Sequence, residues 1–268
     1  QTVPFGQLFW RLASERDQYG RLMNDSMDLR VRYTDNTAYR FPNCIVNQMT
    51  ISVTQSEPVN FSADVIAGSN SSSDVRIDDN TIGSADDLQY LSPARIVTWN
   101  DFVMQVYGDT GSSLVIRGEE IRSFEVTLNN NAERYYTLNG KLAPQDVVAR
   151  KRTIEGNFKL MGRNTGLSTL AYTNQDRFTS TAGIAFGYKL GGETAAPYWA
   201  TGLHGVVFQM EEIALTNDLV ETTVNYSALG DCEANYEATQ KGGTYPITNP
   251  PSGTNYGGPT SPLFPGFV

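Results

Sequence analysis

The chain has 268 residues, a formal net charge of −9 and only 18% charged residues, which is enough length for one large β-rich domain or two small ones. The acidic balance argues against a protein that grips nucleic acid through its phosphates. No apolar run approaches the ~20 residues that span a bilayer, no signal peptide is visible, and the abundant Gly, Ser, Thr and Asn disfavour a coiled coil.

Residues 1–28 predict an irregular N-terminal lead-in. A short helix over residues 8–16 is compatible with the apolar residues there, but nearby Pro and Gly limit its length. Phe5, Phe9 and Trp10 are expected to be packing residues.

Alternating apolar residues predict antiparallel strands between residues 29 and 65. Residues 29–33 form a short strand and residues 45–53 a longer one, followed by a turn and a return strand over 59–65. The apolar face of the longer strand is expected to hold Ile45, Met49, Ile51 and Val53, whereas Asp64 lies on the polar face of the return strand.

A long polar loop is expected over residues 67–90, and loops of this length are usually functional or mobile. Its acidic residues suggest calcium, but Ile82 occupies a ligand position and Gln89 stands where a calcium loop needs Glu. We therefore predict no metal site. The acidic and amide side chains concerned are Asp78, Asp79, Asn80, Asp86 and Asp87.

Residues 96–107 are ambiguous between a strand and a helix. Phe102, Met104 and Val106 alternate as in a strand, whereas Thr98 and Asp101 have the spacing of a helix cap. We favour the strand, because residues 108–113 suit a hairpin loop and residues 114–117 a return strand.

The most informative stretch is residues 121–161. Phe124, Val126 and Leu128 alternate with polar residues, and three Asn residues at 129–131 end this strand. A short helical turn is predicted from Pro144 to Arg150. A second strand then places Ile154, Gly156, Phe158 and Leu160 on one face and Thr153, Glu155, Asn157 and Lys159 on the other.

The rest of the chain predicts a helix over residues 165–177, a strand around Phe186, and two strands over 206–215 and 220–226. A bulge is expected at Glu211-Glu212. Residues 241–268 predict an extended arm, because 242–268 contain six Pro and no charged side chain. The alternatives are a flexible tail or an arm anchored on a neighbouring subunit by Phe264, Phe267 and Val268.

No catalytic, metal or cofactor site is predicted. His204 is the only histidine, and its sequence neighbours include no nucleophile, so a structural role at a strand start is expected. Two Cys and one His are too few and too scattered for a zinc pattern. Cys44 and Cys232 are expected to be buried thiols, although a disulfide between them stays open.

The segment FEVTLNNN, followed by APQDVVARKRTIEGNFKL, resembles the phage tail tube protein family, which combines a strand, an Asn-rich turn, a Pro-led short helix and a second strand. Related patterns recur, so that the likeness covers about residues 40–231. The expected fold is all-β, mainly an antiparallel sandwich or barrel with one or two short helices. A β-rich domain over residues 29–240 would lie between the lead-in and the arm.

The resemblance implies a structural virion protein without enzymatic activity. It would self-assemble, in the host bacterial cytoplasm, into stacked hexameric rings that form the tail tube for DNA ejection. The implied partners are other copies, with tail sheath, terminator and baseplate proteins as further candidates and no membrane. DNA would pass without specific binding if the lining is polar and negative.

Candidates for the lining are polar residues opposite the apolar strand faces, on hairpins 45–65 and 121–161 or on 121–128 with 206–226: Asp64, Glu125, Glu155 and Glu211. An alternative function is a carbohydrate-binding or adhesive β-sandwich. It would use exposed aromatic side chains for sugar stacking, such as Trp99, Tyr198 and Trp199.

Overall fold

The computed structural model describes twelve segments of the chain, and the description below is restricted to them: 5–14, 27–34, 37–68, 76–77, 96–107, 114–116, 120–138, 146–161, 182–189, 197–210, 214–216 and 219–228. They form one α-helix, one short 3-10 turn and fifteen strands, most of them paired antiparallel. The predicted all-β class is confirmed.

The chain divides into two compact units. The first comprises residues 1–49, 63–95 and 129–152, and the second comprises residues 50–62, 96–128 and 153–268. Strands β2, β3 and β7 contribute residues to both. Each unit is described by itself.

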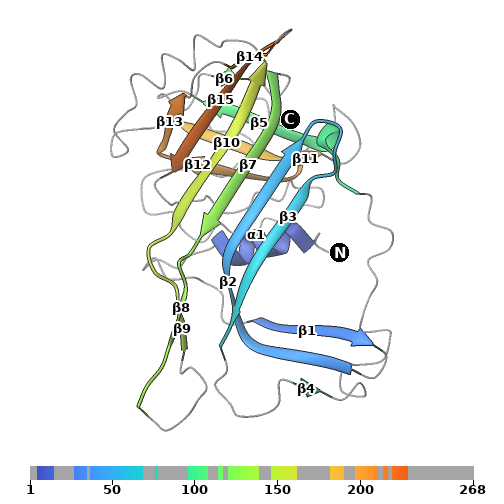
Figure 1. The fold of residues 1–268 in the computed structure, drawn as a ribbon, viewed down its shortest axis with the longest axis vertical. Helices are drawn as coiled ribbons and strands as arrows, with labels where there is room; N and C mark the ends of the chain where they lie inside the picture. The colour runs from blue at the N-terminus through green and yellow to red at the C-terminus, as the bar shows by residue number, and fades with distance from the viewer. Residues whose placement is uncertain are drawn as a thin grey trace, which may run out of the picture. The chain divides into compact units, whose positions relative to one another are not determined.

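Nine strands belong to the main sheet, in the order β1-β2-β7-β10-β15-β13, with β3 and β4 paired to β2 and β14 paired to β15 (Figure 1). Their bounds are β1 (Met27–Thr34), β2 (Thr37–Thr54), β3 (Asn60–Ala67), β4 (Arg76–Ile77), β7 (Ile121–Asn129), β10 (Thr153–Met161), β13 (Val206–Met210), β14 (Ala214–Thr216) and β15 (Leu219–Ala228).

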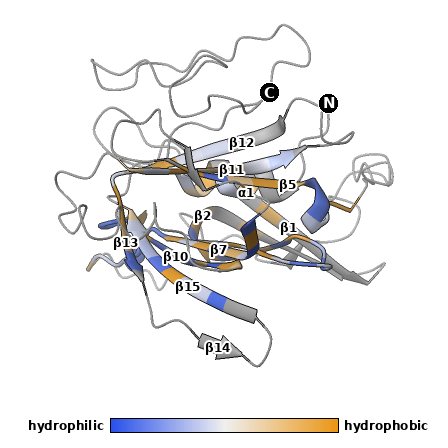
Figure 2. Cartoon of the chain, turned by 90° about the horizontal axis from the view of Figure 1, so that it is seen from above, coloured by the Kyte–Doolittle hydropathy of each residue, from blue (hydrophilic) through white to orange (hydrophobic). Residues whose placement is uncertain are grey.

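In the second unit a four-stranded sheet covers one face of the main sheet. Its order is β12-β11-β5-β6, with bounds β5 (Phe102–Tyr107), β6 (Leu114–Ile116), β11 (Gly183–Lys189) and β12 (Pro197–His204). Figure 2 shows β5, β11 and β12 as one layer and β7, β10 and β15 as the other. The second unit is therefore a β-sandwich.

Aromatic side chains fill the space between the two layers. Phe124 of β7 lies 5.5 Å from Phe102 and 5.0 Å from Phe186, measured between ring centroids. On the main sheet Phe158 meets Phe208 edge to face at 6.2 Å. These rings are the large buried surface that stabilises the sandwich.

The predicted alternation is confirmed along β7 and β10. Phe124, Val126 and Leu128 are buried, as are Ile154, Phe158 and Leu160. The antiparallel register of β10 with β15 places Tyr226 opposite Gly156 and Val224 opposite Phe158, on the same buried face. Because neighbouring residues point to opposite faces, the intervening side chains lie on the other side of the sheet.

In the first unit the helix α1 (Phe5–Ser14) buries Phe9, Trp10 and Ala13. The helix expected over residues 8–16 is present with earlier bounds. Its C-terminal carbonyls lack intrahelical partners and take them from distant side chains. Asn130 Nδ2 donates to the carbonyl oxygen of Ala13 (2.9 Å), and an Arg152 guanidinium nitrogen donates to that of Ser14 (2.8 Å).

Strand β2 changes its buried face part-way along. Cys44 and Val46 are buried before the change, and Met49, Ile51 and Val53 are buried after it. Ile45 is only half-buried, whereas the later residues of its expected face, Met49, Ile51 and Val53, are buried. The change occurs at Asn47, whose carbonyl accepts from the Asn130 N–H (2.7 Å) and whose Oδ1 accepts from the Ala132 N–H (2.8 Å).

The helical turn predicted from Pro144 to Arg150 is wrong over residues 146–148. These residues form β9 (Asp146–Val148), which pairs antiparallel with β8 (Glu133–Tyr135). Two consecutive valines favour a strand, and pairing with β8 supplies partners for their backbone groups. Asn131 leads into this ribbon with φ 48°, which confirms the expected turn role of the Asn run.

Both alternatives for residues 96–107 occur in succession. A 3-10 turn, η2 (Trp99–Asp101), comes first, and the Asp101 carboxylate accepts from the N–H and the hydroxyl of Thr98, each at 3.0 Å. Strand β5 then begins at Phe102. Strand β12 was not predicted, and His204 ends it instead of beginning a strand.

Cys44 has a buried side chain, as expected, and its Sγ donates to the carbonyl oxygen of Phe41 at 3.0 Å. Several predictions lie outside the described residues: the helix over 165–177, the acidic loop residues 78–87, the bulge at Glu211-Glu212, Cys232 and the arm 241–268. Among the helical residues that are described, no segment has the length and hydropathy to cross a membrane.

Candidate functional site

The candidate site is the polar face of the main sheet in the second unit, opposite the aromatic core. Four neighbouring strands contribute to it, β7, β10, β15 and β13. We call it the polar face, and its residues are Glu125, Thr127, Glu155, Asn157, Gln209, Asn225 and Ser227. They reach this side because each alternates with a residue of the buried face.

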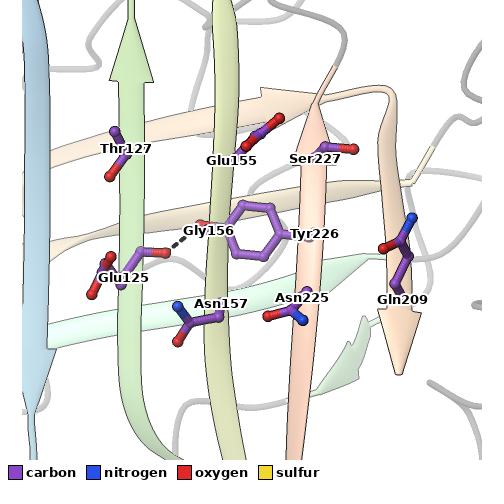
Figure 3. Close-up of a pocket in the computed structure, with 9 residues that line it drawn as sticks. All are labelled: Glu125, Thr127, Glu155, Gly156, Asn157, Gln209, Asn225, Tyr226 and Ser227. Carbon is purple, nitrogen blue, oxygen red and sulfur yellow. Dashed lines mark hydrogen bonds between the residues drawn. The ribbon is translucent and has the colours of Figure 1, made fainter. Parts of the chain in front are cut away.

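The polar side chains are arranged in rows across the strands. The registers place Asn157 opposite Asn225, and Asn225 opposite Gln209, so three amides follow one another across three strands. Glu125 lies at the same level in Figure 3. In the next row Glu155 is opposite Ser227. The face thus combines carboxylates, amides and a hydroxyl on a rigid sheet.

The face is hollowed rather than flat. A depression of about 420 Å³ lies over these residues, with Gly156 and Tyr226 in its floor. The hydroxyl of Thr127 lies 3.0 Å from that of Thr50 in β2, so the polar character continues onto the next strand. A hollow lined by such groups holds water more readily than an apolar surface.

Tyr226 and Gly156 support this floor from the core side. The Tyr226 hydroxyl donates to the carbonyl oxygen of Glu125 at 2.9 Å. A Cβ atom on residue 156 would lie 2.1 Å from that carbonyl oxygen and 2.4 Å from the tyrosine hydroxyl. Only glycine leaves room for this contact.

Glu125 and Glu155 carry the charge of the polar face, and Lys159, on the same side of β10, is exposed as well. Glu125 and Glu155 are both exposed, and within the described residues neither forms an ion pair. Arg122 is already paired with Glu221 of β15, and its Nε donates to Gln55 Oε1 at 3.3 Å. Exposed carboxylates on a wet surface repel phosphates.

The structure brings two of the four predicted lining residues together, Glu125 and Glu155. Asp64 lies in the first unit and is exposed, where its carboxylate accepts from Asn47 Nδ2 at 3.0 Å. Glu211 lies outside the described residues, as do Phe264, Phe267 and Val268 of the arm. Trp99 is 37% exposed, while the side chains of Tyr198 and Trp199 in β12 are not described.

The amides of the polar face were not singled out from the sequence, although the signal was present. The alternation that assigns Glu155 to the polar side assigns Asn157 to it as well. Asn225 and Gln209 follow from the same period in β15 and β13. The contact of Tyr226 with the carbonyl of Glu125 was harder to predict. The one sequence feature that pointed to it is Gly156, because a glycine inside a strand often marks a close approach by another group.

A family model described as phage tail tube protein matches residues 23–253. The chain belongs to the phage tail tube protein family. The resemblance found in the sequence is confirmed, and with it the all-β, tail-tube-like fold. This tail tube protein is a structural component of the virion tail, where it associates with other tail components.

A comparison with curated proteins gives no match. Among solved structures, one chain of the "Cryo-EM structure of the anti-feeding prophage (AFP) baseplate, 6-fold symmetrised" is similar to this tail tube protein at 14% identity and a TM-score of 0.32. The match covers 47% of this chain and 87% of that one.

Proposed function

We propose that this tail tube protein self-assembles into stacked hexameric rings whose channel is lined by the polar face. The observation that carries the proposal is the two-sided main sheet of the second unit. One side is a closed aromatic core, and the other is a hollowed polar surface with exposed Glu125 and Glu155. A channel wall needs this combination, because it must be stiff on one side and wet on the other.

The polar composition supports passage of DNA without retention. Phosphates bind where Lys and Arg neutralise them, and the exposed charges among the residues that line the hollow are carboxylates. Asp64 and Glu211 are further candidates for the lining. No catalytic residue and no cofactor form part of the proposal.

Ring assembly has a physical basis in the sheet. A heterologous contact that closes on itself gives a ring, and stacking of rings gives a tube. Sheet edges of adjacent copies can pair, which satisfies their backbone groups. We propose assembly in the host bacterial cytoplasm, with sheath, terminator and baseplate proteins as further partners.

The test is negative-stain electron microscopy of the purified protein over a range of concentrations. Rings or hollow tubes are expected, and an averaged end view counts the copies in each ring. Dispersed monomers at every concentration would contradict the proposal. A glycan screen with Trp99→Ala would then examine the carbohydrate-binding alternative.

The orientation of the polar face needs its own measurement. A heavy-atom cluster attached through maleimide to a Glu155→Cys variant should give density inside the channel in end views. The same reagent applied to the unsubstituted protein measures the background from Cys44 and Cys232. Density on the outer wall would overturn the assignment of the lining while leaving ring assembly intact.

A further inference from the structure

The apolar side chains that the structure leaves exposed are concentrated in one place. Seven large hydrophobic residues are exposed among those described, and four of them lie in or beside the ribbon formed by β8 and β9. We call these four the ribbon patch: Tyr135, Tyr136, Leu138 and Val148. A clustered set of exposed aromatic and aliphatic side chains marks an interaction surface more often than scattered ones do.

The two faces of the ribbon differ. Arg134 and Val147 are cross-strand partners and share one face. Val147 is buried, and Arg134 Nε donates to the carbonyl oxygen of Ala67 at 3.2 Å, so this face packs on the first unit. The opposite face carries Val148 and Tyr135, which are 49% and 58% exposed. Glu133 and Asp146 share this face with them, so it carries two apolar and two acidic residues.

Few interactions within the ribbon stabilise it. A two-stranded hairpin alone is marginally stable in water. An ion pair between Glu133 and Arg150 joins its two strands, but both side chains are more than half exposed, and such pairs contribute little. Covering the ribbon patch with another apolar segment would remove aromatic surface from water and stabilise the ribbon.

The sequence contains a segment of matching chemistry. Residues 242–268 have no charged side chain and include six Pro, with aromatic residues among them. Pro-rich segments bind aromatic surfaces at low entropic cost, because the proline ring already restricts the backbone. Extended at ~3.1 Å per residue, 27 residues span roughly 80 Å.

We propose that the C-terminal segment 242–268 docks on the ribbon patch, with its proline and aromatic rings against Tyr135, Tyr136 and Val148. The docked segment covers the exposed face of the ribbon. This docking is separate from ring formation, because it requires neither a closed ring nor the polar face.

The test uses the full chain with the photoreactive residue benzoylphenylalanine in place of Phe264. After irradiation, mass spectrometry identifies the residues that are cross-linked. Cross-links to residues 133–138 and 146–150 are expected to dominate. In the same protein carrying Tyr135→Ser and Tyr136→Ser, the yield at the ribbon should fall at least about tenfold, because buried tyrosines carry much of the affinity of such contacts.

The matched control is Ile96→Ser, which removes an exposed apolar side chain in the second unit and should leave the yield unchanged. Cross-links located mainly elsewhere, or none at all, would overturn the proposal. Equal loss in the tyrosine and Ile96 variants would also overturn it. If the double variant fails to fold, the positions of the cross-links in the otherwise unsubstituted chain still show whether the segment docks on the ribbon patch.

Mixing light and heavy isotope-labelled protein shows whether the segment docks within a chain or between copies, and both satisfy the proposal. The irradiation is done on dispersed protein and on assembled protein. A protein that forms no rings can still give the ribbon cross-links, and a protein that forms rings can lack them. The failure of this inference is therefore distinguishable from that of the proposed tube function.

Discussion

The phenol of Tyr226 reaches over Gly156 and donates a 2.9 Å hydrogen bond to the carbonyl oxygen of Glu125. The bond joins β15 to β7 across the intervening strand β10. It fixes the backbone from which the Glu125 side chain projects into the polar face.

Gly156→Ala is expected to destabilise the protein by about 3 kcal/mol, at the upper end of the cost of overpacking. The new Cβ would overlap the Glu125 carbonyl oxygen, which is backbone and cannot rotate away. The denaturant midpoint measures the loss. Lys159→Ala, on an exposed position of the same strand, should change stability by less than about 0.5 kcal/mol. A Gly156→Ala protein with the unsubstituted midpoint would contradict the geometry.

Tyr226→Phe keeps the ring and removes the hydroxyl. The expected loss is about 1 kcal/mol, the usual net contribution of one hydrogen bond. The stacking of the ring on Phe124, with centroids 6.3 Å apart, should persist. Thermal unfolding checks the magnitude. A loss as large as that of Gly156→Ala would mean that the ring itself has moved, and the hydrogen bond would not be the cause.

Asn130→Ala is expected to cost about 2 kcal/mol, because the buried amide donates to the carbonyl oxygens of both Ala13 and Val46. Hydrogen exchange should rise first in α1, whose C-terminal carbonyl loses its partner. The matched control is Asn157→Ala on the polar face, where the effect should stay below about 0.5 kcal/mol. Equal exchange increases throughout the first unit would refute the specific role of Asn130.

Charge reversal on the polar face tests its relation to DNA. Assembled Glu155→Lys protein is expected to retain double-stranded DNA more strongly than the unsubstituted protein, with retention that falls as salt rises. Glu57→Lys makes the same change in net charge at an exposed turn between β2 and β3 and should behave like the unsubstituted protein. If both variants retain DNA equally, net charge and not the face is responsible.

The alternation of apolar and polar residues was sufficient to predict the strands that bury one face. Phe124, Val126 and Leu128 in β7, and Phe158 and Leu160 in β10, alternate so regularly that both strands and their polar sides follow from the sequence. Glu125 and Glu155 were located by this reasoning. The same reasoning failed for β12, because the Gly, Ala and Pro residues of PYWATGLH carry little strand preference.

Contacts between distant residues account for the other errors. The helical turn expected near Val147 is a strand because β8 pairs with it, and no local signal reports that pairing. The change of buried face in β2 lies between Val46 and Met49. Asn47, in this interval, bonds to backbone atoms of Asn130 and Ala132, more than eighty residues away. Period-2 reasoning has no means of locating such a break.

The anchoring of α1 determines when that helix can become fixed during synthesis. Its last two carbonyls bond to Asn130 and Arg152, which are 117 and 138 residues further along the chain than Ala13 and Ser14. The helix leaves the ribosome before its anchors, because both anchors lie further along the chain. Such distant contacts form slowly, because a long loop must close first. We expect pulsed-labelling experiments to find α1 protected only after β7 and β10, so that this helix becomes fixed late in folding.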